Sequence, residues 1–343
     1  MKRVSRRYSL VCGLVLAAAG FAAPAWAYRL THEVRVPGDG GWDYLTVDSA
    51  GQHLYVSHGD RVEVIDLKSL MPAGSIAGTQ GVHGIALAED LGRGYISAGA
   101  TGSVVVFDLV SFARIAEIKT TGQNPDAILY EPRSHRVFAF NGRSRDVTAI
   151  DARTNRVIGT LALKAKPEFA VTDGAGHIFV NLEDKNSIAK IDPQAFKVES
   201  VWALKGCEEP SGLAIDRAHA RLFSVCSNKV MEVVDASSGR LVAQLPIGAN
   251  VDGAGFDDAR QLAFASGGDG TLTIVKEETP EKFTVSETAA TKKGARTMVV
   301  DEANHRVFLS TAERGPSSAP IAGQPRSRAG VVPNTFEVLV VEP

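Results

Sequence analysis

The fold is decided by residues 211–251, whose sequence is SGLAIDRAHARLFSVCSNKVMEVVDASSGRLVAQLPIGANV. This segment contains four short runs rich in Val, Ile, Leu, Phe and Ala, at residues 212–215, 221–225, 230–234 and 241–246. Runs of this kind, bounded by Asp, Asn, Ser or Gly, are typical of β-strands joined by tight turns. One four-stranded meander buries too little apolar surface to be stable alone, so copies of it must pack together.

Copies of this segment recur along the chain with a period near 42 residues. A marker that closes the first run of each copy repeats at intervals of 40 to 44 residues, and a second marker recurs at the end of the third run. Four strands in such a period are typical of a β-propeller rather than a helical solenoid. We therefore predict an all-β protein, a seven-bladed β-propeller. The first marker falls at Asp48, Ala88, Glu131, Asp173, Asp216, Asp257 and Asp301, and the second at Asp66, Asp108, Asp151, Asp192, Asp235 and Lys276.

The two ends of the chain complement each other. Residues 28–36 alternate apolar and polar side chains and predict a strand that belongs to no unit of its own. The seventh unit supplies only three runs, at residues 296–300, 306–310 and 336–341. We predict that the N-terminal strand completes the last blade, which closes the ring and removes a free sheet edge. A single propeller domain then spans residues 28–343.

Residues 1–27 are predicted to be a signal peptide and not part of the fold. Lys2, Arg3, Arg6 and Arg7 precede an apolar run that is too short for a stable membrane anchor, and Ala25-Trp26-Ala27 fits a cleavage site. The segment SRRYSL at residues 5–10 partly matches a twin-arginine signal, but Ser9 stands where a bulky apolar residue is usual. We expect a periplasmic protein without a membrane span, exported by the general secretory route rather than the twin-arginine route.

The charge balance excludes one class of function. The full chain carries 37 basic and 39 acidic side chains. Removal of the four basic residues of the signal leaves 33 basic and 39 acidic side chains, a net charge of −6. A sequence-independent nucleic-acid groove needs clustered Lys and Arg, so this balance argues against nucleic-acid binding and is typical of a soluble monomer.

In several units an Asp at the end of the third run is followed three positions later by Ser or Thr, as in Asp66 with Ser69 and Asp235 with Ser238. We interpret these pairs as turn structure, because an Asp at a strand end accepts hydrogen bonds from the backbone of the next turn. Unit four has Pro193 and Ala195 at this turn, a change that a turn tolerates and a catalytic pair does not.

Alignment of the units predicts a ligand site at the mouth of the central channel. The loops that lead into the innermost strands lie on one face of a propeller, where their side chains converge. Oxygen ligands suit Ca²⁺, and a histidine extends the choice to a transition metal, so we predict a divalent cation held by Asp43, His83, Asp126 and Glu168. The alternatives are a polyol or sugar lactone, or side chains that only bind backbone groups and channel waters. The ligand-binding positions are Asp43, His83, Asp126, Glu168, Ser211, Asp252 and Arg296.

Two further features are predicted on the same face. Residues 312–334 are rich in Pro, Gly and Ser, and so long an irregular segment predicts a lid or collar across the channel mouth. Basic side chains of the neighbouring loops either recruit an anionic partner or only solvate the loop tips. These basic residues are Arg143, Arg145, Lys185, Lys229, Arg314, Arg326 and Arg328.

Two cysteines remain after removal of the signal, and both belong to unit five. Cys207 precedes its innermost strand and Cys226 ends its second strand, so both reach the same face of one blade. In an oxidising compartment we predict a disulfide between them. The alternative is a pair of free thiols near His83 or another metal ligand.

Several segments resemble a known family. The sequences LYVS at residues 54–57 and IFVN at residues 178–181, with the V-x-V-I-D-type runs that follow, resemble the YVTN-type repeats of YncE-like bacterial propellers. The resemblance extends over the whole mature chain and includes GCEEPSG at residues 206–212 and the proline-rich insertion before the final strand. It implies an exported seven-bladed propeller. It implies little about activity, although some related repeat proteins are named lactonases by analogy of fold.

These observations favour binding over catalysis. We expect a small molecule, a metal ion or an envelope protein to bind at the channel mouth. A metal-dependent lactonase or related hydrolase is the first alternative, in which Asp126 or Glu168 holds the metal or acts as base and Arg296 stabilises the oxyanion. A passive interaction scaffold of the cell envelope is the second. No Gly-x-Ser-x-Gly segment supports a serine nucleophile.

Overall fold

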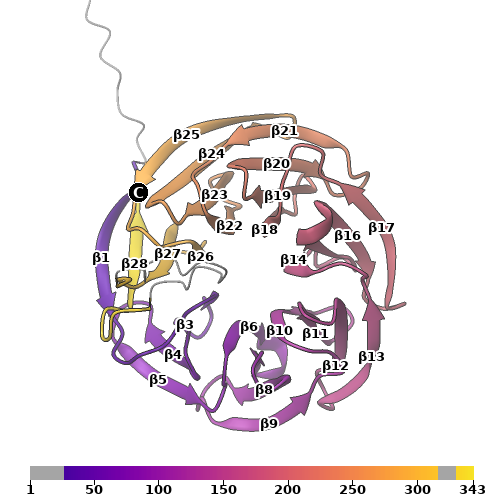
Figure 1. The fold of residues 1–343 in the computed structure, drawn as a ribbon, viewed down its shortest axis with the longest axis vertical. Helices are drawn as coiled ribbons and strands as arrows, with labels where there is room; N and C mark the ends of the chain where they lie inside the picture. The colour runs from indigo at the N-terminus through magenta and orange to yellow at the C-terminus, as the bar shows by residue number, and fades with distance from the viewer. Residues whose placement is uncertain (1–26, 316–329) are drawn as a thin grey trace, which may run out of the picture.

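The computed structural model describes residues 27–315 and 330–343, which form a ring of seven four-stranded antiparallel sheets (Figure 1). The prediction of a seven-bladed β-propeller is therefore confirmed. The predicted signal peptide, apart from Ala27, lies outside the described residues, as do residues 316–329 of the predicted loop. None of the helices in the described residues has the length and apolar character needed to cross a membrane.

Each blade runs from the channel outward in chain order, so that its first strand lines the channel and its last strand lies at the rim (Figure 1). Blades 1 to 3 consist of β2 (Leu45–Asp48), β3 (His53–His58), β4 (Arg61–Asp66) and β5 (Pro72–Ala77); β6 (Val82–Ala88), β7 (Arg93–Ala98), β8 (Ser103–Asp108) and β9 (Arg114–Lys119); and β10 (Pro125–Glu131), β11 (Arg136–Asn141), β12 (Asp146–Asp151) and β13 (Arg156–Ala162).

Two short 3-10 helices interrupt the loops of blades 2 and 4, and blade 7 takes its outermost strand from the other end of the chain. The short helices are η1 (Glu89–Leu91) and η2 (Glu183–Lys185). Blades 4 to 7 consist of β14 (Pro167–Thr172), β15 (Ile178–Leu182), β16 (Ser187–Asp192) and β17 (Lys197–Ala203); β18 (Pro210–Asp216), β19 (Arg221–Cys226), β20 (Val230–Asp235) and β21 (Leu241–Pro246); β22 (Val251–Asp257), β23 (Leu262–Gly267), β24 (Thr271–Thr279) and β25 (Lys282–Ala290); and β26 (Thr297–Asp301), β27 (Arg306–Thr311), β28 (Glu337–Glu342) and β1 (Arg29–Arg35).

The apolar runs form the middle strands of the blades. Each middle strand is covered on both faces by the neighbouring blades, so its side chains are buried on both sides. Every residue of β19 is buried, whereas the rim strand β17 alternates between exposed and half-buried residues. One apolar cluster fills the space between each pair of neighbouring blades; between blades 2 and 3 it includes Tyr95, Val104 and Val137. Because no blade buries its two faces alone, closure of the ring completes the core.

The closing strand is where the sequence placed it. β1 pairs antiparallel with β28, in a register that sets Arg29 opposite Glu342 and Arg35 opposite Glu337. Tyr28 continues into the neighbouring blade, where its ring packs edge-on against Phe264 at 5.2 Å. The prediction that the N-terminal strand completes the last blade is confirmed.

The turn aspartates lie on the face opposite the channel mouth. Asp66 accepts hydrogen bonds from the backbone N–H of Ser69 at 2.7 Å and from its hydroxyl at 2.6 Å. In blade 4, Asp192 accepts bonds only from backbone N–H groups, those of Gln194 and Ala195, each at 2.8 Å. These bonds confirm the structural interpretation of the repeated acid. Blade 6 is the exception, because β24 continues past the predicted marker Lys276 to end at Thr279.

Candidate ligand site at the channel mouth

A β-bulge sets up most of the predicted ligand positions. Five of them are the second residue of an innermost strand, and in each of these strands the pairing register shifts at that point. A bulge takes a residue out of the ladder and re-aims its side chain, here toward the channel. Asp43 and Arg296 lie just before β2 and β26. The five bulge residues are His83, Asp126, Glu168, Ser211 and Asp252.

Buried polar side chains of the second strands support this irregular backbone. The hydroxyl of Ser57 accepts the N–H of Asp43 at 2.8 Å, and that of Ser97 accepts the N–H of Gly84, also at 2.8 Å. The amide of Asn181 donates to the carbonyl of Ser211 at 2.9 Å. Ser57 and Asn181 are the last residues of the YVTN-like segments, so these segments supply the partners that the bulged backbone lacks.

Three of the four predicted metal ligands come together. His83 Nδ1 lies 2.7 Å from Asp43 Oδ2 and 3.6 Å from Asp126 Oδ1, and one ligand atom from each residue lies within 4.8 Å of the other two. Burial of His83 opposes its charge, but the bond to Asp43 and the charges of Asp126 and Asp43 outweigh it and raise the pKa of the imidazole to about 9. The imidazolium thus occupies the space between two carboxylates that a cation would share.

Glu168 lies beside this group rather than within it. Lys166 Nζ is 2.5 Å from Glu168 Oε1 and also pairs with Glu183. Burial and the charge of Asp126 raise the pKa of Glu168 to about 8 in spite of Lys166. Burial, with the charge of Asp43, likewise raises the pKa of Asp126 to about 6 against the effect of His83. Burial and the nearness of the other carboxylates thus disfavour the charged forms of Asp126 and Glu168.

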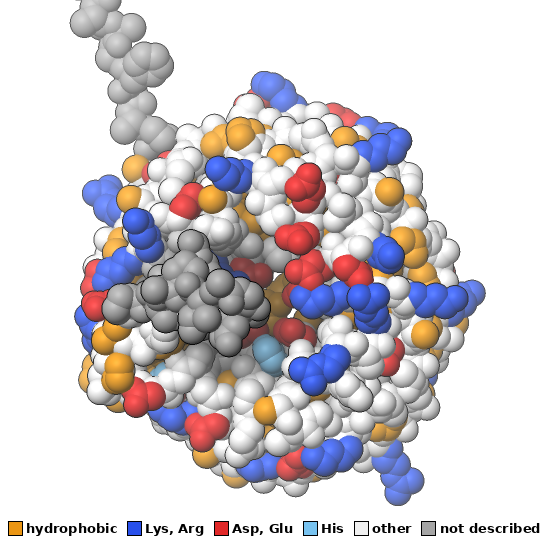
Figure 2. Space-filling view, viewed as in Figure 1, with side chains coloured by type: hydrophobic (Ala, Val, Ile, Leu, Met, Phe, Trp, Pro, Cys, Tyr) orange, Lys and Arg blue, Asp and Glu red, His pale blue; other side chains and the backbone are white. Residues whose placement is uncertain are grey.

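The remaining predicted residues form the other side of the mouth. Arg296 Nη1 lies 3.2 Å from Asp252 Oδ2, and burial nevertheless raises the pKa of Asp252 to about 7. The hydroxyl of Ser211 donates to the carbonyl of Val251 at 3.2 Å, so it is engaged by the neighbouring blade. Figure 2 shows acidic side chains and a histidine gathered around the central hollow.

Two aromatic residues that the sequence analysis missed form the floor of the site. Tyr44 of blade 1 and Phe169 of blade 4 meet across the channel with ring centroids 5.1 Å apart. Burial, reinforced by the charges of the mouth carboxylates, raises the pKa of Tyr44 well above its usual range. Figure 2 shows hydrophobic side chains at the bottom of the hollow. The signal was present, because each aromatic directly follows a ligand position where the other units have small residues, namely Gly84, Ala127, Gly212, Gly253 and Thr297.

The described ends of the predicted collar lie beside the mouth. Arg314 and Val331 form an antiparallel bridge, and the N–H of Gly315 donates to the carbonyl of Gly330 at 2.9 Å. A cavity of about 840 Å³ is lined by Arg296 and, from the start of this segment, by residues 312–314. The ends of the segment are thus on the predicted face, and the collar itself, residues 316–329, lies outside the described residues.

Some residues of the predicted basic rim make contacts within the protein. Arg145 pairs with Asp184 at 2.8 Å, and the guanidinium of Arg314 lies over the ring of Trp42, 5.3 Å from its centroid. Arg143, Lys185 and Lys229 are exposed. Arg326 and Arg328 lie outside the described residues. Two of the described basic side chains thus have partners within the protein, which favours a structural role for them.

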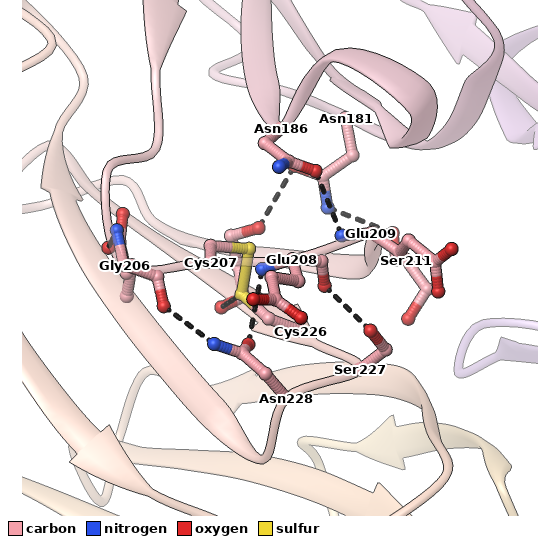
Figure 3. Close-up of a disulfide and its surroundings, with 12 residues drawn as sticks. Asn181, Asn186, Gly206, Cys207, Glu208, Glu209, Ser211, Cys226, Ser227 and Asn228 are labelled. Atoms are coloured by element: carbon pink, nitrogen blue, oxygen red, sulfur yellow. Dashed lines mark hydrogen bonds between the residues drawn. A yellow bond between two sulfur atoms is a disulfide. The ribbon is translucent and has the colours of Figure 1, made fainter.

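The predicted disulfide joins Cys207 to Cys226, whose Cα atoms are 5.3 Å apart (Figure 3). It holds the loop before β18 against the β19–β20 hairpin on the mouth face. Asn228 supports the same loop, since its side chain accepts the N–H of Glu208 at 3.1 Å and donates to the carbonyl of Gly206 at 2.9 Å. The prediction of a disulfide is confirmed, and the alternative of two free thiols beside a metal is wrong.

Comparisons with known proteins support the class of fold. No protein-family model matches the chain, and no curated protein matches it by sequence. Among solved structures, it is similar to the hydrazine synthase of Kuenenia stuttgartiensis, with a TM-score of 0.70 and 15% identity over 79% of this chain and 92% of that one. The WD40 repeats of RRP9 give a TM-score of 0.77 at 8% identity, over 93% and 100% of the two chains.

The structure of U3-55K gives a TM-score of 0.75 at 8% identity, over 92% of this chain and 98% of that one. Likenesses at such low identity concern the fold alone, since propellers with the same architecture carry out unrelated functions. The protein is a seven-bladed β-propeller, a fold that serves as a scaffold for binding ligands or proteins.

Proposed function

We propose that this protein is an exported, YncE-like propeller that binds a cationic ligand, foremost a divalent metal ion, at its channel mouth. The predicted signal peptide supports a periplasmic location, and the YVTN-like repeats support the family. The net charge of −6 without the signal segment supports small molecules or envelope proteins as partners over nucleic acid, and we propose a monomer.

One observation carries the proposal: Asp43, His83 and Asp126, from three successive blades, bring their ligand atoms within 4.8 Å of one another. Tyr44, which directly follows Asp43, packs its buried ring against Phe169 of blade 4, with ring centroids 5.1 Å apart. A cation that enters from the open side would meet two carboxylates and one imidazole, with Glu168 close enough to add its charge. Carboxylates with one imidazole suit Mn²⁺ or Zn²⁺ better than Ca²⁺, which prefers an all-oxygen shell.

Hydrolysis of a lactone remains the second candidate function. It requires a metal-bound water or a carboxylate base and a cation that stabilises the oxyanion. Among the described residues, Asp126 and Glu168 can hold a metal with its bound water or act as the carboxylate base. The pairing of Arg296 with Asp252 weakens the assignment of the oxyanion role to Arg296, and this supports binding over catalysis.

The experiment measures metal binding by protein that has been freed of metal with EDTA. We expect calorimetric titration with Mn²⁺ to detect a bound ion. In nuclear magnetic resonance spectra, the same ion should perturb the nitrogen resonances of the His83 imidazole. Replacement of Asp43, Asp126 and Glu168 together by Ala should remove one bound ion per chain and leave the circular dichroism spectrum unchanged, because none of the three supports a turn.

The matched control replaces Glu208 and Glu209 by Gln, which removes exposed acids of the same face that lie outside the mouth. This control should bind like the wild type. Equal binding by the triple variant and the wild type would refute the mouth site. A lactone panel with and without EDTA then separates the two functions, since EDTA-sensitive turnover would favour the hydrolase.

A further inference from the structure

A second group of ligand-type side chains lies on the face opposite the channel mouth, between blades 5 and 6. His219 Nδ1 is 2.6 Å from Asp216 Oδ2 and 2.9 Å from Glu277 Oε1. Asp216 and His219 belong to the turn between β18 and β19, and Glu277 lies in β24. Their ligand atoms all fall within 4.8 Å of one another, as in the mouth, although no residue is shared.

Glu277 is the exception at its position in the repeat. The backbone N–H of this position donates to the turn between the first two strands in blade 6, and the same bond is made in other blades. In those blades the side chain is apolar and packs toward the preceding blade. The apolar equivalents are Leu67, Leu109, Ala152 and Ala236. A carboxylate has thus replaced a core side chain where it faces His219.

The carboxylate of Glu277 is buried, with an ion pair to His219 and no aligned hydrogen bond from a described residue. The residue is 3% exposed, and neither of its oxygens accepts a well-aligned hydrogen bond from a described residue. His219 Nδ1 lies between the two carboxylates and carries at most one proton, so it cannot donate a full hydrogen bond to both Asp216 and Glu277. A buried carboxylate that lacks hydrogen bonds is destabilising, and a bound cation would relieve this cost.

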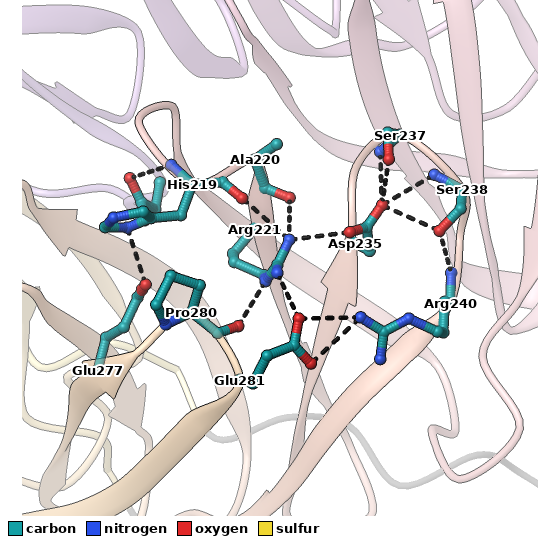
Figure 4. Close-up of polar contacts among 11 residues, drawn as sticks. His219, Ala220, Arg221, Asp235, Ser237, Ser238, Arg240, Glu277, Pro280 and Glu281 are labelled. Atoms are coloured by element: carbon teal, nitrogen blue, oxygen red, sulfur yellow. Dashed lines mark hydrogen bonds and ion pairs between the residues drawn. The ribbon is translucent and has the colours of Figure 1, made fainter.

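The neighbouring arginine does not supply that cation. Arg221 donates to Asp235 at 2.9 Å, to Glu281 at 2.8 Å and to the carbonyl of Pro280 at 2.7 Å (Figure 4). Its guanidinium also donates to the carbonyl of His219 at 2.9 Å, so its donors are engaged by groups other than the carboxylate of Glu277.

The chemistry of the three side chains selects the type of ion. Two carboxylates and an imidazole suit a first-row divalent metal such as Zn²⁺, Mn²⁺ or Co²⁺, whereas Ca²⁺ prefers an all-oxygen shell. The second oxygen of Asp216 accepts the backbone N–H of Ala218 at 2.9 Å, which orients the carboxylate as outer-shell bonds do in metal sites. His219 has 37% of its side chain exposed, so the ion can enter from solvent and keep water ligands on that side.

We propose that Asp216, His219 and Glu277 form a structural site for a divalent transition metal that joins blade 5 to blade 6. The ion would link a turn of one blade to a strand of the next, so that its binding free energy adds to the stability of the ring. This site shares no residue with the mouth site and lies on the opposite face of the ring.

The test uses full-length mature protein freed of metal with EDTA and titrated with Zn²⁺ and Co²⁺. We expect Zn²⁺ to raise the melting temperature and Co²⁺ to give visible absorption bands of nitrogen and oxygen ligation. Glu277→Leu restores the apolar residue of the repeat, so it should fold without metal. Combined with the mouth substitutions Asp43→Ala, Asp126→Ala and Glu168→Ala, it should lose both effects. His219→Asn, which copies Asn304 of blade 7, should bind Zn²⁺ at least about tenfold more weakly.

The mouth variant with Asp43, Asp126 and Glu168 replaced by Ala is the control, and it should keep the Zn²⁺-dependent rise in melting temperature. Element analysis should then find one ion fewer in Glu277→Leu than in the wild type. An unchanged rise in melting temperature and an unchanged metal content in Glu277→Leu and His219→Asn would overturn the proposal. A wild type that shows no stabilisation by any of these ions would overturn it as well.

Discussion

Acidic side chains on the two faces of the ring have pKa values that are shifted in opposite directions. On the turn face, the hydroxyl and N–H of Ser69 lower the pKa of Asp66, and the hydrogen bonds of Ser237 and Ser238 outweigh burial and lower the pKa of Asp235 to about 2. On the mouth face, burial raises the pKa of Asp252 to about 7 and that of Glu168 to about 8. Both the turn carboxylates and the mouth carboxylates recur at fixed places in the repeat. They differ in the number of hydrogen-bond donors within reach of each carboxylate.

This difference assigns a task to each of the two sets of carboxylates. The aspartates that end the third strands, such as Asp66 and Asp235, are satisfied by their own hairpins and stabilise the blades, so they have little affinity left for a ligand. Glu277 is the exception on this face, because its carboxylate is buried without an aligned hydrogen bond. The mouth carboxylates are held on bulges, close to one another and partly out of water, at a cost in stability. Sites that store such a cost are candidates for binding, because a ligand of opposite charge relieves it.

The largest expected effect is on the pH dependence of stability. Asp126, Glu168, Asp252 and His83 all have raised pKa values in the folded protein. The folded state therefore binds more protons than the unfolded state from about pH 4 upward, and the free energy of unfolding falls as the pH rises toward 9. A shift of Asp252 from 3.8 to about 7 corresponds to roughly 4 kcal/mol on its own.

Urea unfolding of metal-free protein at pH 5 and pH 8 measures this slope. Asp252→Asn should flatten it, whereas Asp108→Asn, at an exposed turn on the opposite face, should leave it unchanged in this range. Below pH 4 the turn acids reverse the sign, because their lowered pKa values make the folded state the weaker proton binder. Stability that rises from pH 5 to pH 8 would contradict the comparison of the two faces.

An effect of intermediate size is expected at the disulfide, which stabilises a mouth-face loop where no aspartate cap does. The bridge joins residues 19 apart, and the chain-entropy relation gives about 3 kcal/mol for a loop of this length. Cys207→Ser with Cys226→Ser should lower the free energy of unfolding by about this amount. Thiol titration of native wild-type mature protein should find no free thiol, and detection of two would contradict the structure.

The smallest expected effect is a difference in the free energy of unfolding between two variants, each of which replaces one acid of one face. Asp235 accepts bonds from the turn of β20 and β21 and pairs with Arg221. Asp235→Ala should therefore cost about 1–2 kcal/mol, as the loss of a capping residue does. Asp252→Asn should cost nothing at pH 8 or should stabilise. Equal losses in the two variants, measured by urea unfolding, would show that the faces do not differ in the way described.

The sequence predicted the architecture better than it predicted the site. The period near 42 residues and the runs of the opening segment located the strands of blade 5 to within two residues, since alternation and turn residues are local properties. The longer third strand of blade 6 was missed, because Lys276 occupies the place of an aspartate without ending the strand. Glu277 passed unnoticed for the same reason, since its burial depends on blade 5.

Local pattern by itself determined the repeat, the seven blades, the closing strand and the pairing of Cys207 with Cys226, because each follows from residues read along one unit or at the two chain ends. Only the tertiary structure decided that Tyr44 meets Phe169 across the channel and that Asp43, His83 and Asp126 share one space. The physical reason is that these contacts join different blades. Their distances and their charges depend on how the ring closes, which no single unit encodes.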